Sequence, residues 1–126
     1  MTSAIKVSRG DVWWVDMSDA STVGGEQDKD RPYVIMSRDS VNDLGLHVVG
    51  VPLTTQVRKA STFRIMLPVS EFSKDPSSNK PIQTSVALTD HTRVLDRSRL
   101  IQRVARLSDS AIISVGLGLS YLLDIS

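Results

Sequence analysis

Hydrophobic and polar residues alternate over several short stretches of the chain, a pattern typical of β-strands that bury one face. After residue 107 the spacing of apolar residues becomes helical, and Ser108 is a favourable N-cap for such a helix. The order predicts a mainly β (α+β) fold, in which a small antiparallel β-barrel carries a C-terminal helix. The stretches that predict strands are residues 10–17, 31–37, 46–55, 62–68, 85–96 (with a break) and 100–107. The apolar positions expected to face the core from the helix are Ile112, Val115, Leu119, Leu122 and Leu123.

Some segments make more specific predictions. Successive strand residues face opposite ways, so one of Trp13 and Trp14 should enter the core and the other should face outward. Gly50 and Pro52 favour a bulge or an edge position for their strand. Residues 70–83 are rich in Ser, Pro and Lys and predict an exposed loop. The remaining connections are a loop at residues 18–30 and a polar turn or short helix at 38–45.

The composition narrows the classes of protein. A chain of 126 residues predicts a single domain over residues 1–126. The absence of cysteine excludes disulfides, thiolate zinc sites and cysteine catalysis, and fits a reducing cytoplasm. The N-terminus lacks the apolar core of a signal peptide, and the most apolar stretch, residues 111–123, is too short to span a bilayer. We therefore expect a cytoplasmic protein that does not contact membranes.

The charge is unevenly distributed although the net charge is only +1. Residues 1–55 carry five basic and eight acidic side chains (net −3), and residues 56–106 carry ten basic and four acidic ones (net +6). Such a basic region attracts a phosphate backbone. A merely solvated surface is the alternative interpretation of the same asymmetry.

The available catalytic side chains point to one reaction. No HExxH motif, acidic cluster with metal spacing, P-loop or GxSxG motif occurs, so no metal or cofactor is predicted. Cleavage of RNA through its own 2′-OH needs only position, a base, an acid and positive charge from the protein. Arg31, Thr54 (or Thr55) and Glu26 are the right residue types. Each has a plainer alternative: an ion pair of Arg31 with Asp28 or Asp30, an ordinary strand end, and a solvated carboxylate.

Five ordered blocks then carry a more specific signal: "RGDVWWVDM", "GGEQ", "RPYVIMS", "VPLTT" and "SVALTDHTRVLDRSRL". Together they resemble the MazF/PemK family of toxin–antitoxin endoribonucleases, from about residue 9 to residue 123. The resemblance implies a homodimer of small SH3-like (CcdB/PemK-like) barrels. It implies metal-independent, sequence-specific cleavage of single-stranded RNA, with 2′,3′-cyclic phosphate and 5′-hydroxyl ends. It also implies inhibition of translation and growth, and neutralisation by a cognate MazE-like antitoxin.

The resemblance also assigns the site. The family's essential arginine falls on Arg31, its essential threonine on Thr54 and its acidic loop residue on Glu26. Two departures leave the general acid and base open: His91 stands where many relatives have glutamine, and Leu88 where one branch has a catalytic arginine. His91 either shares in proton transfer or is a turn residue bonded to backbone. The residues expected to bind substrate are Thr55, Gln27, Asp90, His91, Arg58 and Lys59.

Two other classes of function share the predicted barrel. A CcdB-like toxin poisons DNA gyrase without cleaving anything, but it uses a C-terminal Trp-Gly-Ile ending, and this chain ends "LLDIS". An SH3-like module that binds proline-rich peptides needs an aromatic-lined groove, and the chain has only six aromatic residues. RNA cleavage in EDTA, compared with an effect on gyrase, separates these classes.

Overall fold

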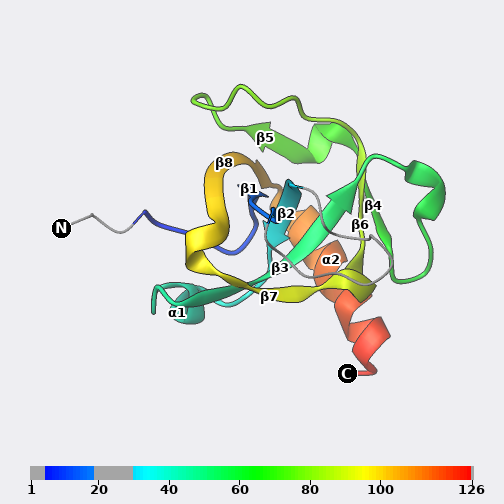
Figure 1. The fold of residues 1–126 in the computed structure, drawn as a ribbon. Helices are drawn as coiled ribbons and strands as arrows, with labels where there is room; N and C mark the ends of the chain where they lie inside the picture. The colour runs from blue at the N-terminus through cyan, green and yellow to red at the C-terminus, as the bar shows by residue number, and fades with distance from the viewer. Residues whose placement is uncertain (1–4, 19–29, 126) are drawn as a thin grey trace.

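A computed structural model describes residues 5–18 and 30–125 of the chain (Figure 1). The strands of these residues form one curled antiparallel sheet in the order β4-β6-β3-β2-β1-β8-β5, and β7 pairs with β3 beside this path. Helix α2 packs against the sheet (Figure 1), which confirms the predicted mainly β fold, a small antiparallel barrel formed by the curled sheet with a C-terminal helix. The strands are β1 (Asp11–Val15), β2 (Arg31–Ile35), β3 (His47–Thr54), β4 (Ile65–Leu67), β5 (Phe72–Lys74), β6 (Ser85–Ala87), β7 (Arg93–Asp96) and β8 (Leu100–Leu107). The helices are α1 (Asp39–Asn42), α2 (Asp109–Leu123) and four 3-10 turns at Val57–Lys59, Val69–Glu71, Thr89–His91 and Arg97–Arg99.

Strand β1 lies between β2 and β8, so an early strand pairs with the last one. Its two tryptophans separate as predicted. Trp13 is buried in one hydrophobic cluster, with only 4% of its surface exposed, whereas Trp14 is half-buried and packs against the other cluster. The curled sheet therefore buries side chains on both faces, and Trp14 lies at the border of one of them.

Strand β3 is central, so of the two alternatives that Gly50 and Pro52 left open, a bulge or an edge, the edge position was wrong. β3 pairs with β2 along one side, and on the other with β7 through residues 47–50 and with β6 through residues 53–54. Pro52 lies where the partner changes from β7 to β6, so its missing N–H costs no ladder bond there. Gly50 is required by packing, because a Cβ at this position would lie 2.9 Å from Leu95 and 3.0 Å from Tyr33.

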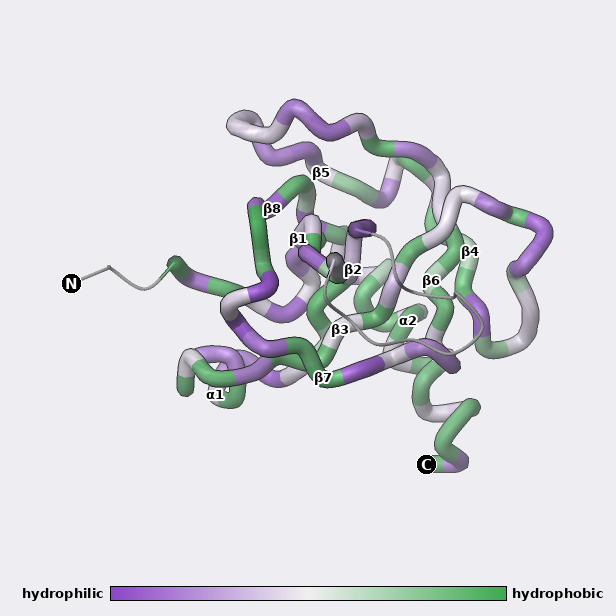
Figure 2. Tube along the Cα trace, viewed as in Figure 1, coloured by the Kyte–Doolittle hydropathy of each residue, from purple (hydrophilic) through white to green (hydrophobic). Residues whose placement is uncertain are grey.

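The segment 70–83 was predicted to be an exposed loop, and this is wrong for its first part. Residues 69–71 form a 3-10 turn and Phe72–Lys74 form β5, which pairs with β8. The partly buried ring of Phe72 packs against the core and anchors this edge strand. Its polar neighbours Ser73 and Lys74 made the strand difficult to recognise from the sequence. The rest of the connection to β6 is largely hydrophilic (Figure 2).

Helix α2 begins as predicted, because the Ser108 hydroxyl accepts a hydrogen bond from the amide of Ala111. Gly118 allows close packing, since a Cβ there would lie 2.7 Å from the Phe63 carbonyl oxygen. The prediction that Leu122 and Leu123 face the core was wrong: they are 36% and 59% exposed. The reason is visible in Figure 1, where the last turns of α2 extend beyond the sheet. None of the described helices has the length and apolar character needed to cross a bilayer.

Candidate active site

Arg31 and Thr54 lie together at one end of the sheet. Arg31 is the first residue of β2 and Thr54 the last residue of β3, and these strands are antiparallel neighbours. Because Tyr33 pairs with Pro52, continuing the register two residues brings Arg31 opposite Thr54. A pocket of about 320 Å³ opens at this point. Its walls are formed by Trp14, Asp30, Arg31, Pro32, Leu53, Thr54, Thr55, Pro81, Gln83 and Ser85.

The guanidinium of Arg31 is only partly bonded. Its Nε atom is buried and has no hydrogen-bond partner within the described residues. No ion pair of Arg31 with Asp30 forms among the described residues, and Asp30 Oδ1 instead accepts a hydrogen bond from the Met17 amide at 2.9 Å. Asp28, the other partner that the sequence left open, lies outside the described residues. A buried N–H donor without a partner is costly. The rest of the half-buried side chain lines the pocket, so the guanidinium is placed to bind an anion there.

Thr54 offers a hydroxyl beside this guanidinium. Its Oγ1 accepts a hydrogen bond from the Gln56 amide at 3.2 Å, which orients the side chain at the end of β3. A hydroxyl that accepts one bond still has its own proton to donate. Thr55, which is exposed, lines the same pocket. The pair of threonines and the arginine can thus present several donors to a phosphate group.

Tyr33 lies in the core next to this arrangement. Its hydroxyl is buried, and burial raises the pKa of Tyr33, while the positive charges of Arg93 and Arg31 oppose this shift. The phenol therefore stays neutral at physiological pH. It is unsuited to act as a base, and the proton acceptor for a 2′-OH must come from elsewhere.

The other predicted site residues lie apart from this pocket or outside the described residues. Glu26 and Gln27 belong to residues 19–29, which the structure does not describe. Asp90 and His91 lie on the 3-10 turn before β7 and are not among the pocket-lining residues. Asp90 accepts two hydrogen bonds from Arg64, at 2.9 and 2.6 Å, and this partner holds the pKa of Asp90 below its usual value.

Arg58 and Lys59 form a basic continuation of the site. They lie on the 3-10 turn that follows Thr55 along the chain, and the side chain of Arg58 is exposed. They do not line the pocket itself. They are therefore placed to attract a polyanion that extends past the pocket. Among the described residues, no group of three or more His, Asp or Glu side chains is arranged to hold a metal ion.

Sequence reasoning missed several pocket residues. Pro81, Gln83 and Ser85 were not singled out, because their proximity to Arg31 arises only in the folded chain. Trp14 was indicated by the sequence, since one member of the tryptophan pair was expected to face outward.

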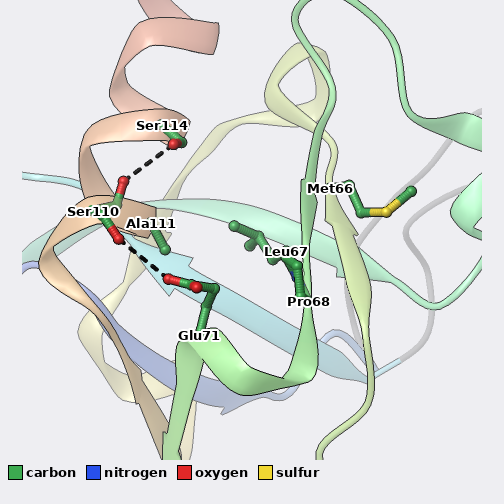
Figure 3. A pocket seen from close by; sticks show the side chains of 7 residues that line it. All are labelled: Met66, Leu67, Pro68, Glu71, Ser110, Ala111 and Ser114. Atoms are coloured by element: carbon green, nitrogen blue, oxygen red, sulfur yellow. Dashed lines mark hydrogen bonds between the residues drawn. The ribbon is translucent and has the colours of Figure 1, made fainter.

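A second pocket, of about 240 Å³, lies between α2 and the 3-10 turn before β5 (Figure 3). Its only charged lining residue is Glu71, whose carboxylate accepts hydrogen bonds from Ser108 at 2.5 Å and Ser110 at 3.2 Å. Ser110 in turn accepts a hydrogen bond from Ser114 through its backbone oxygen. These bonds fasten the start of α2 to the sheet, so the carboxylate has a structural role. The pocket with Arg31 and Thr54 is the stronger candidate for catalysis.

Comparison with known protein families gives a match over nearly the whole chain. Residues 8–123 match the family model described as PemK-like, MazF-like toxin of type II toxin–antitoxin system. The chain is 33% identical over 101 residues to Endoribonuclease MazF of Staphylococcus saprophyticus, covering 80% of this chain and 78% of that protein.

Solved structures support the same fold. The structure of MazF from Deinococcus radiodurans superposes with a TM-score of 0.73 at 24% identity, covering 96% of this chain and 99% of that one. A MazE–MazF structure from the same organism superposes with a TM-score of 0.70 at 22% identity, covering 98% of this chain and 100% of that one. At these identities the likeness shows a shared fold.

Proposed function

The chain belongs to the family of PemK-like and MazF-like toxins of type II toxin–antitoxin systems, and on this premise we propose that it is an endoribonuclease that cleaves single-stranded RNA in the pocket at Arg31 and Thr54. Its relatives include proteins named as endoribonucleases. The observation that carries the proposal is the convergence of Arg31, with its unpartnered Nε, and the Thr54 hydroxyl on one pocket.

The chemistry follows from these groups. The 2′-OH of the substrate attacks the adjacent phosphorus and the bond to the 5′-oxygen of the next nucleotide breaks, after which that oxygen takes a proton from water. The negative charge that develops on the phosphorane is stabilised by the Arg31 guanidinium and the Thr54 hydroxyl. The products are a 2′,3′-cyclic phosphate and a 5′-hydroxyl, and the reaction needs no metal ion.

Proton transfer is assigned to the loop that precedes β2. Glu26 takes the proton of the 2′-OH, and Gln27 shapes the loop around the substrate. Leu88, at the position where one branch of the family has a catalytic arginine, is 2% exposed and belongs to the core. That arginine therefore has no replacement at this position. Glu26, Arg31 and Thr54 remain the residues proposed for catalysis.

We also propose how the toxin is assembled and controlled. Residues 1–126 form one toxin domain, two copies form a homodimer, and the dimer acts in the cytoplasm. Its inhibitor is a MazE-like antitoxin, as the MazE–MazF structure of Deinococcus radiodurans suggests by analogy. Arg58 and Lys59, next to the pocket, attract both the RNA and an acidic segment of the antitoxin, so the two compete.

The CcdB-like alternative is not favoured. The match to PemK-like and MazF-like toxins and the similarity to named endoribonucleases both support RNA cleavage.

The decisive experiment is incubation of the purified protein with a long single-stranded RNA in EDTA. We expect fragments cut at a recurring sequence, whose 5′ ends accept phosphate from polynucleotide kinase without prior phosphatase treatment. Intact RNA, cleavage only after a divalent metal is added, or fragments with 5′-phosphates would contradict the proposal. A parallel incubation with gyrase and plasmid tests the alternative.

A further inference from the structure

Trp14 and Lys80 make a contact at the candidate active site that the proposed catalysis does not use. The indole of Trp14 lines the pocket that contains Arg31 and Thr54. The ammonium of Lys80 lies over this ring, with Nζ 4.4 Å from the ring centroid. Lys80 is half-buried, whereas most lysines extend into water, so its position on an aromatic face next to the candidate active site requires an explanation.

The segment that carries Lys80 is held in place at its base. Asp75 accepts a hydrogen bond from Arg103 Nε at 2.8 Å and donates its own amide to the Val104 carbonyl at 3.0 Å. Ser78, which is buried, accepts hydrogen bonds from Lys74 through its carbonyl and from the Lys80 amide through its hydroxyl. This connection is therefore an ordered wall.

The same segment then passes along the pocket. Pro81 and Gln83 line it, shortly before β6 begins at Ser85. The backbone that carries Lys80 is thus held in place, and the long side chain of Lys80 is free to change its rotamer. The wall sets where the ammonium can reach: over Trp14 and the mouth of the pocket.

We propose that Trp14 is a stacking platform for one nucleobase beside the scissile phosphate, and that Lys80 covers this platform in the free protein. When RNA binds, the base replaces the ammonium on the ring and Lys80 moves to a neighbouring phosphate. This inference rests on the proposed function, since it assigns a base-binding role within the same site. It also gives the long connection between β5 and β6 a role in substrate binding.

The exchange is favourable on physical grounds. Stacking of a base on an aromatic side chain strengthens binding by about 5- to 150-fold per base, a range whose upper part exceeds the usual contribution of a cation–π contact. The displaced ammonium is not left unpaired, because the RNA that displaces it supplies phosphate oxygens. Covering the ring in the free protein also shields an apolar surface from water.

The test uses fluorescence and RNA that cannot be cleaved. Trp13→Phe leaves Trp14 as the only indole, because the chain has two tryptophans. This variant is titrated with a pool of single-stranded 2′-O-methyl RNA, which lacks the attacking hydroxyl, and with an abasic oligonucleotide of the same length. We expect the pool to quench Trp14 emission, and the abasic chain to bind, by anisotropy, without quenching.

Substitutions separate the two roles. Trp14→Leu should weaken binding of the pool by about 5- to 150-fold and leave binding of the abasic chain unchanged, while Trp14→Phe should retain most of the affinity. Lys80→Ala should weaken both and reduce the slope of log K against log salt by about 0.7, the value for one contact to a single strand. Lys6→Ala is the matched control, since Lys6 pairs with Asp43 and lies outside the pocket.

Several results would overturn the inference: no quenching by the pool, equal binding of the pool by Trp14→Leu and its parent, or an unchanged salt slope for Lys80→Ala. Trp14 packs partly on the core, so the fold of each variant is first checked by circular dichroism. If Trp14→Leu unfolds the chain, RNA binding by Trp14→Phe is used in its place, because phenylalanine keeps an aromatic ring. The binding assays do not depend on cleavage. Intact RNA in the EDTA experiment would therefore refute the proposed function, whereas cleavage with no role for Trp14 would refute only this inference.

Discussion

Replacement of Arg31 should remove catalysis and leave the fold nearly unchanged. Most partly buried arginines support a fold through ion pairs, so removing them leaves a partner without its bond. Arg31 differs, because its buried Nε has no hydrogen-bond partner in the described part of the chain and Asp30 is bonded to Met17. Arg31→Met, which keeps the length and loses the charge, should therefore change the free energy of unfolding by less than about 1 kcal/mol.

The catalytic loss should be far larger. Loss of one preorganised donor to a transition-state oxyanion reduces kcat by about 10²–10³, or about 2.7–4 kcal/mol. Arg31→Lys should fall between wild type and Arg31→Met, since it keeps the charge but loses the planar fork that binds phosphate through two nitrogens.

The assay is single-turnover cleavage of a long single-stranded RNA in EDTA, paired with urea denaturation of each variant. Arg38→Met serves as the matched control, because Arg38 is exposed and lies outside the pocket. Cleavage by Arg31→Met within tenfold of wild type would refute the assignment of Arg31. A large loss of unfolding free energy in Arg31→Met, with Arg38→Met unaffected, would show that the guanidinium supports the fold. The reasoning from its missing partner would then be wrong.

Three further predictions follow from the contacts described above. Thr54→Val should reduce cleavage by about 10²-fold without loss of fold, measured in the same RNA assay, and retention of full activity would remove the hydroxyl from the proposed chemistry. Gly118→Ala should destabilise the protein by about 1–3 kcal/mol in urea denaturation, because its Cβ would lie 2.7 Å from the Phe63 carbonyl oxygen; an unchanged midpoint would mean that the helix shifts freely. Asp90→Asn should cost about 1 kcal/mol at pH 7, since Arg64 lowers the pKa of Asp90 in the folded state. A lowered pKa stabilises the fold above the ordinary value of 3.8, and this stability is lost as the pH falls through the lower folded-state pKa. Wild type and Asp90→Asn should thus converge in acid, and a constant difference down to pH 2 would count against the ion pair.

The parts of the fold that sequence predicts well are those whose local pattern agrees with their final environment. The strand with Trp13 and Trp14 and the helix capped by Ser108 are such cases. Strand β5 was missed because a single ring, Phe72, anchors it between polar neighbours. The central place of β3 was missed because proline usually occurs in edge strands. Pro52 is tolerated in this central strand because it lies where the partner of β3 changes from β7 to β6.

The same distinction holds for the candidate site. Arg31 and Thr54 were assigned from ordered sequence blocks, and the structure brings both to one pocket. The contact between Trp14 and Lys80 joins residues far apart in the chain, so no local pattern indicates it. The pairing of Arg64 with Asp90 also joins residues far apart in the chain, and it gives a structural partner to a carboxylate that was expected to bind substrate.

The pairing of β1 with β8 also affects when the protein becomes dangerous to the cell that makes it. The sheet around Arg31 is complete only when residues 100–107 have been synthesised and have reached a strand formed by residues 11–15. At about 5–20 residues per second, the roughly 85 residues between the end of β1 at Val15 and the start of β8 at Leu100 take about 4–17 s to make. We expect the nascent chain to lack a complete site during this interval.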